Sequence, residues 1–491
     1  MTHALDLHAL ARHTMIDAGF APNFPPEVSD EIQAFMHGRD MDSQAMPPPR
    51  DLRSLLWSSI DNAESRDLDQ VEFALKLPDA SIRVLIGIAD VDAFVSRGSA
   101  IDRFAAKNTT SVYTGVETFP MLPDELSSGL TSLLEDVDRR AVVVEIIVDK
   151  DGAVRSSDVY AATLRNHAKL SYESVGAWLD HQAAMPHAVA RIEGLEAQIR
   201  LQVEAANRLR TLRRQNGALN FETPEATPII RDGRVTDLAI TERNSARDII
   251  ENFMIAANST IATFLESNGV NSIRRVVREP ERWPRIVEIA DGLGETLPAE
   301  PDARALADFL AKRKAADPAR FPDLSLAVIK LIGAGEYAVE QPGITPENEE
   351  GHFGLAVPDY THATAPNRRY ADLLTQRLVK AVIARNPAPY TLDELKNFAA
   401  RCTERESAAR KVARQMRKVA SAVLLSHRIG EKFKAIVTGV TTKGTFVRTL
   451  APPFDGRVVR GEAGLDVGDK VRVRLVHTNP ERGFIDFARD E

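Results

Sequence analysis

The sequence predicts a multidomain α+β protein, with a small N-terminal helical domain, a central α+β domain and a C-terminal OB-fold β-barrel. Two observations support this division. Strand-like runs rich in β-branched residues alternate with long segments of helical periodicity as far as about residue 428. Beyond that point, short alternating strands are separated by Gly, Pro and Asn turns, a pattern typical of a five-stranded OB-type barrel. We expect domains at 1–50, 51–428 and 429–491.

The N-terminal domain is predicted from two helical segments, at about 2–18 and 26–37, that end at the breaker "MPPPR". A helix-turn-helix is one arrangement open to them. In the central domain, "IRVLIGIADVDAFV" and "RRAVVVEIIVDKDGAV" predict strands. Several later segments show helical periodicity and end at Gly, Asn or Pro, which makes the central domain α+β.

Composition narrows the class of protein. The 491 residues, 44% of them hydrophobic, are enough for several domains with a large core. The chain has neither an apolar run of membrane-spanning length nor the pattern of a secretory signal, so we expect no membrane partner and a cytoplasmic location. The single cysteine, Cys402, fits a reducing compartment. A net charge of −8 argues against indiscriminate coating of nucleic acid, although charge can still gather in a cleft.

An acid-rich stretch, "SSIDNAESRDLDQVEF", carries three aspartates, Asp61, Asp67 and Asp69. It is not a calcium loop of the EF-hand type, because Ala63 and Arg66 occupy positions that need an oxygen ligand and a glycine. Carboxylates held about 4 Å apart repel each other and must bind a cation or a proton. From this stretch alone, a site for a hard divalent cation and a solvated acidic loop both remain open.

Basic and aromatic residues supply further candidates. In "THATAPNRRYADLLTQR", Pro366 marks a helix start, and we expect Arg368 and Arg369 in the first turns, where an anion is favoured. A phosphate gripped by both arginines and an ordinary surface helix are the two interpretations of this segment. One face of a later helix carries three further arginines, Arg410, Arg414 and Arg417. This face is either a solvated surface or a surface that binds successive phosphates. The aromatic candidates for base stacking are Tyr113, Tyr172 and Phe221.

Taken in order, these motifs resemble the ribonuclease II (RNB) exoribonuclease family. The resemblance rests on "IDNAESRDLD", "IGIADVDAFVSRGSAID", "TTSVYTGVETFPMLPDELSSGLTSL", "NGALNFETPEA", "IIENFMIAAN" and "HFGLAVPDYTHATAPNRRYADLLTQRLV", followed by the terminal barrel. It covers the chain from about Arg50 onward. It implies an RNB catalytic domain at 51–428, an RNA-binding barrel of the S-one type, and magnesium-dependent hydrolysis of single-stranded RNA from the 3′ end to 5′-nucleoside monophosphates. No obligate protein partner is implied, so we expect a monomer.

The resemblance also implies roles for individual residues. Magnesium, with manganese as an alternative, would be bound by Asp61, Asp67, Asp69 and Gln70. The catalytic candidates are Asp69, Arg368, which would stabilise the scissile phosphate, and Glu251, at an acidic position near the site. The RNA-binding candidates are Tyr113, Tyr172, Phe221, Arg369, Tyr370, Arg410, Arg414 and Arg417.

The chain departs from the family pattern at three positions and in its domain architecture. Gln70 stands where the family has a further aspartate, which leaves a catalytically weakened RNA-binding protein as the alternative function. Gly87 replaces a common histidine, and Asn367 replaces an aliphatic residue. Family members usually carry two cold-shock OB domains before the catalytic domain, and the first 50 residues are too few for even one. We expect the small helical domain in their place.

Overall fold

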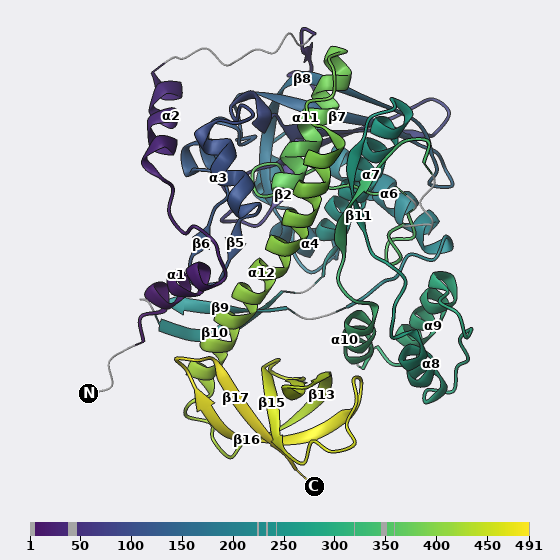
Figure 1. Ribbon diagram of the computed structural model, residues 1–491. Helices are drawn as coiled ribbons and strands as arrows, with labels where there is room; N and C mark the ends of the chain where they lie inside the picture. Colours follow the sequence, from purple (N-terminus) through teal and green to yellow (C-terminus); the bar gives the residue numbers. More distant parts are fainter. Residues whose placement is uncertain are drawn as a thin grey trace.

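The computed structural model of the protein describes residues 5–37, 47–222, 225–231, 234–241, 243–318, 320–344, 351–357 and 359–490. A curled sheet with helices packed around it forms the main body, and a closed barrel lies at one end (Figure 1). This architecture confirms the predicted α+β class and the C-terminal OB-like barrel. Within the described ranges, no helix is both long enough and apolar enough to cross a membrane.

The central sheet has the strand order β1-β8-β2-β3-β4-β7, and β7 also pairs with β8. Its strands are β1 (Arg50–Asp51), β2 (Trp57–Asp61), β3 (Gln70–Lys76), β4 (Ile82–Ala89), β7 (Asp138–Val148) and β8 (Val154–Ser171). The long strand β8 pairs with β7 through its first part and with β2 through its last part, so the sheet curls back on itself. Both faces of β4 and of the first five residues of β3 are therefore buried, and the β-branched residues of β4 favour such a strand.

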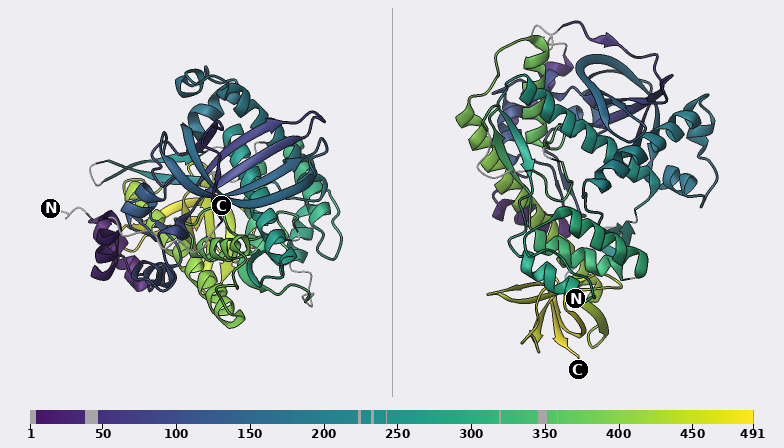
Figure 2. Two further views of the ribbon diagram at one scale, coloured as in Figure 1. Left: turned by 90° about the horizontal axis from the view of Figure 1, so that it is seen from above. Right: turned by 90° about the vertical axis from the view of Figure 1, so that its right-hand side faces the viewer.

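Helices cover the sheet and continue to the barrel, as the two views of Figure 2 show. They are α3 (Ala100–Asn108), α4 (Tyr172–Leu179), α5 (His187–Ala190), α6 (Leu195–Gln215), α7 (Ser245–Ser267), α8 (Trp283–Asp291), α9 (Ala303–Ala316), α10 (Phe321–Ile332), α11 (Tyr370–Ala384) and α12 (Leu392–Leu425). Helix α6 packs on β3 and α7, whereas α12 runs from the sheet to the barrel. Thr391 and Glu394 form a capping box that fixes the start of α12.

Short elements complete the central domain. They are a 3₁₀ turn at Val91–Ala93, a π-helical turn at Glu125–Leu130, and the strand pairs β5 (Val112–Tyr113) with β6 (Thr118–Phe119), β9 (Glu225–Arg231) with β10 (Arg234–Thr241), and β11 (Ser272–Val276) with β12 (Glu336–Glu340). A Cβ atom at Gly87 of β4 would lie 2.6 Å from the Leu164 side chain and 3.1 Å from that of Val71. The close packing of the sheet thus accounts for glycine at this position.

The N-terminal segment contains two helices, α1 (Leu7–Asp17) and α2 (Pro26–Met36), close to the predicted ranges. Helix α1 packs against α12, and α2 packs against α3. In Figure 1 they lie at different heights along the left side of the molecule. The described part of residues 1–50 therefore extends along the main body, and its two helices have different packing partners.

The C-terminal barrel closes in the order β13-β14-β15-β17-β16. Its strands are β13 (Lys432–Thr441), β14 (Gly444–Thr449), β15 (Asp455–Arg460), β16 (Lys470–Asn479) and β17 (Phe484–Arg489). Phe433, Phe454 and Phe487 fill its interior in edge-to-face contacts. Ion pairs tie the barrel to α8 and α10, with Arg285 contacting Asp469 at 3.0 Å and Lys470 contacting Asp323 at 3.3 Å.

A buried ion network joins α11 to the end of β4. The Arg377 guanidinium is 4% exposed and donates to Asp92 (2.9 Å), Asp102 (2.8 Å) and the Tyr390 hydroxyl (2.8 Å). Lys380, one turn later, contacts Asp92 as well, at 2.9 Å. Because α11 begins at Tyr370, directly after Arg368 and Arg369, this network fixes those two arginines relative to the sheet.

We expect Arg377→Met to lower the free energy of unfolding by about 3 to 5 kcal/mol, because the substitution leaves Asp102 buried without its cation and leaves Asp92 with Lys380 alone. Urea denaturation followed by circular dichroism measures this change. Lys396→Met, at an exposed position of α12, is the matched control and should change stability by about 0.5 kcal/mol or less. A loss below about 1 kcal/mol in Arg377→Met would contradict a stabilising role for the network.

Candidate active site

The acid-rich stretch forms the turn between two neighbouring strands. Asp61 is the last residue of β2, and Gln70 is the first residue of β3. The Asn62 amide and the Ser65 hydroxyl donate to Asp61 Oδ1, at 2.7 and 2.9 Å. The chain thus reverses after Asp61 and brings Asp67 and Asp69 back toward it.

Asp69 lies deepest in this group, with an exposure of only 3%. Its Oδ1 accepts a hydrogen bond from the backbone amide of Asn367 (3.1 Å), and its Oδ2 lies 3.6 Å from Nε of Arg368. Burial raises the pKa of Asp69 to about 7, although Arg368 and the Asn367 amide oppose the rise. At neutral pH, the protonated and ionised forms of Asp69 are therefore close in free energy.

Asp67 is half-buried beside Asp69, and its pKa is raised by burial and by the negative charge of Asp61. Arg368 acts in the opposite direction on both Asp67 and Asp69. The three aspartates therefore share one electrostatic environment in which negative charge is in excess. Such an environment favours the binding of a cation.

Backbone hydrogen bonds join the segment around Arg368 to the segment just before β5. The Ser111 amide donates to the Arg368 carbonyl (3.0 Å), and the Tyr370 amide donates to the Thr109 carbonyl (2.8 Å). The Arg368 side chain is 46% exposed, so a ligand can reach it. Helix α11 begins at Tyr370, so both arginines precede the helix, and the expectation that they lie in its first turns is wrong: Arg369 has the extended backbone of an N-cap residue.

A pocket of about 300 Å³ opens beside Arg368. Its walls come from the strand β5, the segment before α11, and the middle of α12, and its lining includes Tyr113, His362, Arg368, Arg369, Cys402 and Arg410. Tyr113 is 49% exposed, and desolvation of its hydroxyl, with the nearby aspartates, raises its pKa to about 12. The predicted stacking residue and one arginine of the basic face of α12 thus lie in one pocket with Arg368.

Tyr172 begins α4 on the Asp61 side of the site. Its pKa is raised by burial and by the charges of Asp61 and Glu72. The Arg247 guanidinium lies 4.3 Å from the centre of its ring. The ring is therefore placed near the acids, with one face covered by an arginine.

Further along α12, Arg414 is exposed and Arg417 is half-buried, so the basic face predicted from the sequence extends from Arg410 toward the barrel. Arg410 also contacts Glu406 at 3.6 Å. Arg369, by contrast, is engaged within the protein, because its guanidinium donates to the buried Asp372 at 2.7 Å. Arg369 therefore lines the pocket while it holds the segment before α11 in place.

Two predicted RNA-binding aromatics lie elsewhere. Tyr370 is 1% exposed, donates to Asp102 (3.0 Å) and packs against Phe398, so it is a core residue and not an RNA contact in this structure. Phe221 is partly buried against the apolar cluster formed by α8, α9 and α10. Tyr370 was expected to bind RNA together with Arg369, but α11 begins directly after Arg369 and places Tyr370 in the interior.

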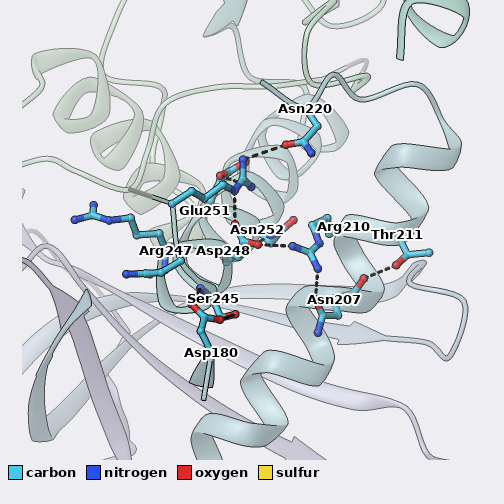
Figure 3. A network of polar contacts seen from close by, with 12 residues as sticks. Asp180, Asn207, Arg210, Thr211, Asn220, Ser245, Arg247, Asp248, Glu251 and Asn252 are labelled. Carbon is cyan, nitrogen blue, oxygen red and sulfur yellow. Dashed lines mark hydrogen bonds and ion pairs between the residues drawn. The ribbon is translucent and has the colours of Figure 1, made fainter. Parts of the chain in front are cut away.

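Glu251 on α7 belongs to a separate polar network (Figure 3). Arg243 donates to Glu251 (3.0 Å), to Asp248 (2.6 Å) and to Asn220 (3.2 Å). Asp248 also pairs with Arg210 of α6. Glu251 thus contacts Arg243, just before α7, and Arg243 in turn reaches Asn220 in the segment after α6. The catalytic role of Glu251 stays a prediction.

Comparison with known proteins decides the family. Residues 49–385 match the RNB domain family, and residues 431–490 match the family described as the RNase II-type exonuclease C-terminal S1 domain. The chain belongs to the RNB family. The resemblance seen in the sequence motifs is thereby confirmed.

Individual RNB relatives extend this finding. Ribonuclease R of Thermotoga maritima is 30% identical over 98% of this chain and 69% of its own length. Ribonuclease R 1 of Lactococcus lactis is 28% identical over 94% of this chain and 59% of its own length. The solved Mycoplasma genitalium RNase R in complex with ribose methylated single-stranded RNA has a TM-score of 0.86 at 23% identity, covering 99% of this chain and 78% of that one. The likeness shows a shared fold, and the chain spans only about three fifths to two thirds of these two curated relatives.

The residues of the RNB site suit a divalent cation. Among the residues that the structure describes, no three acidic, histidine or cysteine side chains are arranged to enclose a metal by themselves. Mg²⁺ does not require this, because it keeps several waters and is commonly bound by one or two carboxylates together with substrate phosphates. The excess negative charge around Asp61, Asp67 and Asp69 and the open approach at Arg368 fit that kind of site.

Sequence reasoning overlooked Glu72, two residues after Gln70 on β3. It is fully buried, and both of its carboxylate oxygens lack a hydrogen-bond partner among the described residues. Burial raises its pKa well above the usual value, and the charge of Asp61 adds to the rise. The signal was present, since an acid inside an otherwise apolar strand is unusual unless it is paired.

The raised pKa of Asp69 predicts a pH effect on the metal-free protein. Because the folded state keeps this proton up to about pH 7, whereas the unfolded chain loses it near pH 4, stability falls as the pH rises between these values. Between about pH 4 and pH 7 in EDTA, we expect the free energy of unfolding of the wild type to fall. The fall should exceed that of Asp69→Asn by on the order of 4 kcal/mol. Urea denaturation at several pH values measures this difference, and parallel curves for the two proteins would contradict it.

Proposed function

We propose that the protein is a magnesium-dependent, hydrolytic 3′–5′ exoribonuclease. It would degrade single-stranded or partly structured RNA to 5′-nucleoside monophosphates in RNA turnover. The observation that carries the proposal is that Arg368 lies with Tyr113 in one accessible pocket and also lies 3.6 Å from the buried Asp69, in a chain of the RNB family. A carboxylate, a guanidinium and an exposed ring are the groups needed for a cation, a phosphate and a base, respectively.

The reaction is hydrolysis of the last phosphodiester. The oxygen of water bonds to phosphorus, the bond from phosphorus to the 3′ oxygen of the preceding nucleotide breaks, and that oxygen takes up a proton. Arg368 would donate to the phosphate and balance its charge in the transition state. Mg²⁺, with Mn²⁺ as an alternative, would be held by Asp61, Asp67, Asp69 and Gln70 and would supply Lewis acidity and an activated water.

Other residues would hold the RNA. Stacking on Tyr113 and Tyr172 fixes terminal bases without reading their identity, since every base has a π-face. Arg410, Arg414 and Arg417 would contact phosphates of the incoming strand, which leads from the pocket along α12 toward the barrel. Neither the base stacking nor the phosphate contacts need a second protein, so we propose a monomer. The single cysteine supports action in the cytoplasm.

Gln70 favours a second candidate, an RNA-binding protein of the RNB family with weakened catalysis. It lies at the start of β3, next to Asp69, where its neutral amide adds no charge to the site. A cation would then be bound less tightly than by a carboxylate. The remaining RNA-contacting groups would be unaffected by this change.

Degradation of 5′-labelled RNA separates the two candidates. With Mg²⁺ or Mn²⁺, the exoribonuclease shortens an unstructured RNA progressively from its 3′ end and leaves DNA of the same sequence intact. The weakened protein binds the RNA and leaves its length unchanged. Products that are cut internally from the start would contradict both candidates.

A further inference from the structure

A buried polar cluster lies behind Asp61, where β2, β3 and α6 pack together. Its members are Ser58, Glu72 and Gln202, and each has an exposure of 0%. Ser58 and Glu72 are directly opposite each other in the antiparallel pair β2–β3. The side-chain amide of Gln202 donates a hydrogen bond to the backbone carbonyl of Glu72, at 3.5 Å. Three strictly buried polar side chains thus surround one point of the sheet.

Four oxygens of this cluster have no hydrogen-bond partner among the described residues: Ser58 Oγ, both carboxylate oxygens of Glu72, and Gln202 Oε1. Burying an unpaired carboxylate costs several kcal/mol. Glu72 differs in this respect from Asp372, which is also fully buried but accepts hydrogen bonds from Ala365 and Arg369. The packing of β3 therefore places an acid in the interior without giving it a donor.

The position of Glu72 on β3 connects it to the candidate metal site. Side chains two residues apart on a strand point to the same face, so Glu72 shares a face with Gln70. Asp61, at the end of the neighbouring strand, is the charged residue whose field acts on Glu72. Glu72 therefore places a carboxylate on the same strand and the same face as Gln70, two residues further along β3.

We propose that Glu72 is a ligand of the divalent cation that Asp61 binds and supplies the carboxylate that Gln70 lacks. This inference rests on the proposed metal site. Glutamate has one methylene more than aspartate, which suits a ligand that starts further from the site. The neutral oxygens of Ser58 and Gln202 would then face a carboxylate whose charge is balanced by the cation.

Titration of the RNA-free protein with Mn²⁺, followed by electron paramagnetic resonance of the free ion, tests the inference without reference to activity. We expect Glu72→Gln to weaken Mn²⁺ binding at least about tenfold, since loss of even an outer-shell partner costs about 10- to 100-fold in metal affinity. The matched control is Glu64→Gln, an exposed glutamate in the loop that precedes β3, which should bind Mn²⁺ as the wild type does.

A double-mutant cycle with Gln70→Asp makes the test specific. If Glu72 replaces the missing acid, Gln70→Asp restores Mn²⁺ affinity to Glu72→Gln, and Glu72 becomes nearly dispensable in the Gln70→Asp background. The thermal midpoint in EDTA gives a second readout. Glu72→Gln should melt no lower than the wild type without metal, because it removes an unpaired buried carboxylate, and it should lose the upward shift that Mn²⁺ gives the wild type.

Equal Mn²⁺ affinity of Glu72→Gln and wild type would overturn the inference while leaving the proposed function intact. So would a variant that melts lower in EDTA yet keeps the full Mn²⁺ shift, because Glu72 would then have only a structural role. A wild type that binds no Mn²⁺, with RNA present or absent, would overturn the proposed metal site and this inference together. If Glu72→Gln does not fold, the wild type and Gln70→Asp still decide: because Glu72 already supplies the carboxylate, Gln70→Asp should bind Mn²⁺ about as tightly as the wild type, and a gain in affinity of about tenfold or more would overturn the inference.

Discussion

Asp69→Asn is expected to lower kcat for RNA hydrolysis by about 10³-fold while RNA affinity changes by no more than about threefold. Asp69 is the most deeply buried of the three aspartates and the one in contact with Arg368 and the Asn367 amide. Asparagine keeps the shape of the side chain but removes the charge that would hold a cation. The groups proposed to bind RNA, such as Tyr113 and Arg410, are left unchanged. Single-turnover hydrolysis and fluorescence anisotropy with labelled RNA measure the two quantities.

Glu64→Gln is the control for Asp69→Asn, since it removes a negative charge from the same loop at an exposed position. Its kcat should stay within about twofold of the wild type, as expected for a surface substitution. Unchanged hydrolysis in Asp69→Asn would overturn the assignment of the site. A parallel loss of RNA binding would instead show that Asp69 holds the fold of the pocket.

Arg368→Ala is expected to lower kcat by about 10³-fold, a typical effect of an arginine that stabilises a phosphoryl transition state. The guanidinium is 46% exposed and 3.6 Å from Asp69, so it can face a phosphate while it remains beside the acids. Its removal also takes away the group that most lowers the pKa of Asp69, so Asp69 should take up a proton at higher pH. The acidic limb of the pH–rate profile should therefore move upward in this variant.

Arg368→Lys should recover only part of the rate, because an ammonium group keeps the charge but lacks the planar fork of arginine. Arg66→Ala is the matched control, since Arg66 is an exposed arginine of the aspartate loop whose partner, Asp124, is 3.9 Å away. It should change kcat by no more than about twofold. A rise of KM without a fall of kcat in Arg368→Ala would show that the arginine only binds RNA.

The parts of the fold that local pattern controls were predictable from the sequence. The β-branched runs around Ile86 and Val144 predicted buried strands, and the alternating C-terminal segment predicted the five-stranded barrel. The turn from Asp61 to Asp69 was also predictable, because polar residues with turn propensity separate two strand-like runs. Each of these features depends on neighbouring residues in the chain.

Features that depend on distant packing were not predictable in the same way. Tyr370 seemed equivalent to the arginines before it, but its contact with Asp102 takes it into the core. Phe221 packs on helices that follow it by some 60 residues or more. Glu72 was overlooked because its burial depends on α6, which packs over β3 only in the folded chain.

The central claim is that this site, with Gln70, hydrolyses RNA from the 3′ end. Release of the 3′-terminal nucleotide tests it most directly, using RNA labelled at the last internucleotide phosphate and product identification by thin-layer chromatography. With Mg²⁺, the label should appear as 5′-nucleoside monophosphate from the earliest time point, and EDTA or Asp69→Asn should abolish its release. Label that stays in RNA bound by the wild-type protein, in either Mg²⁺ or Mn²⁺, would contradict the claim.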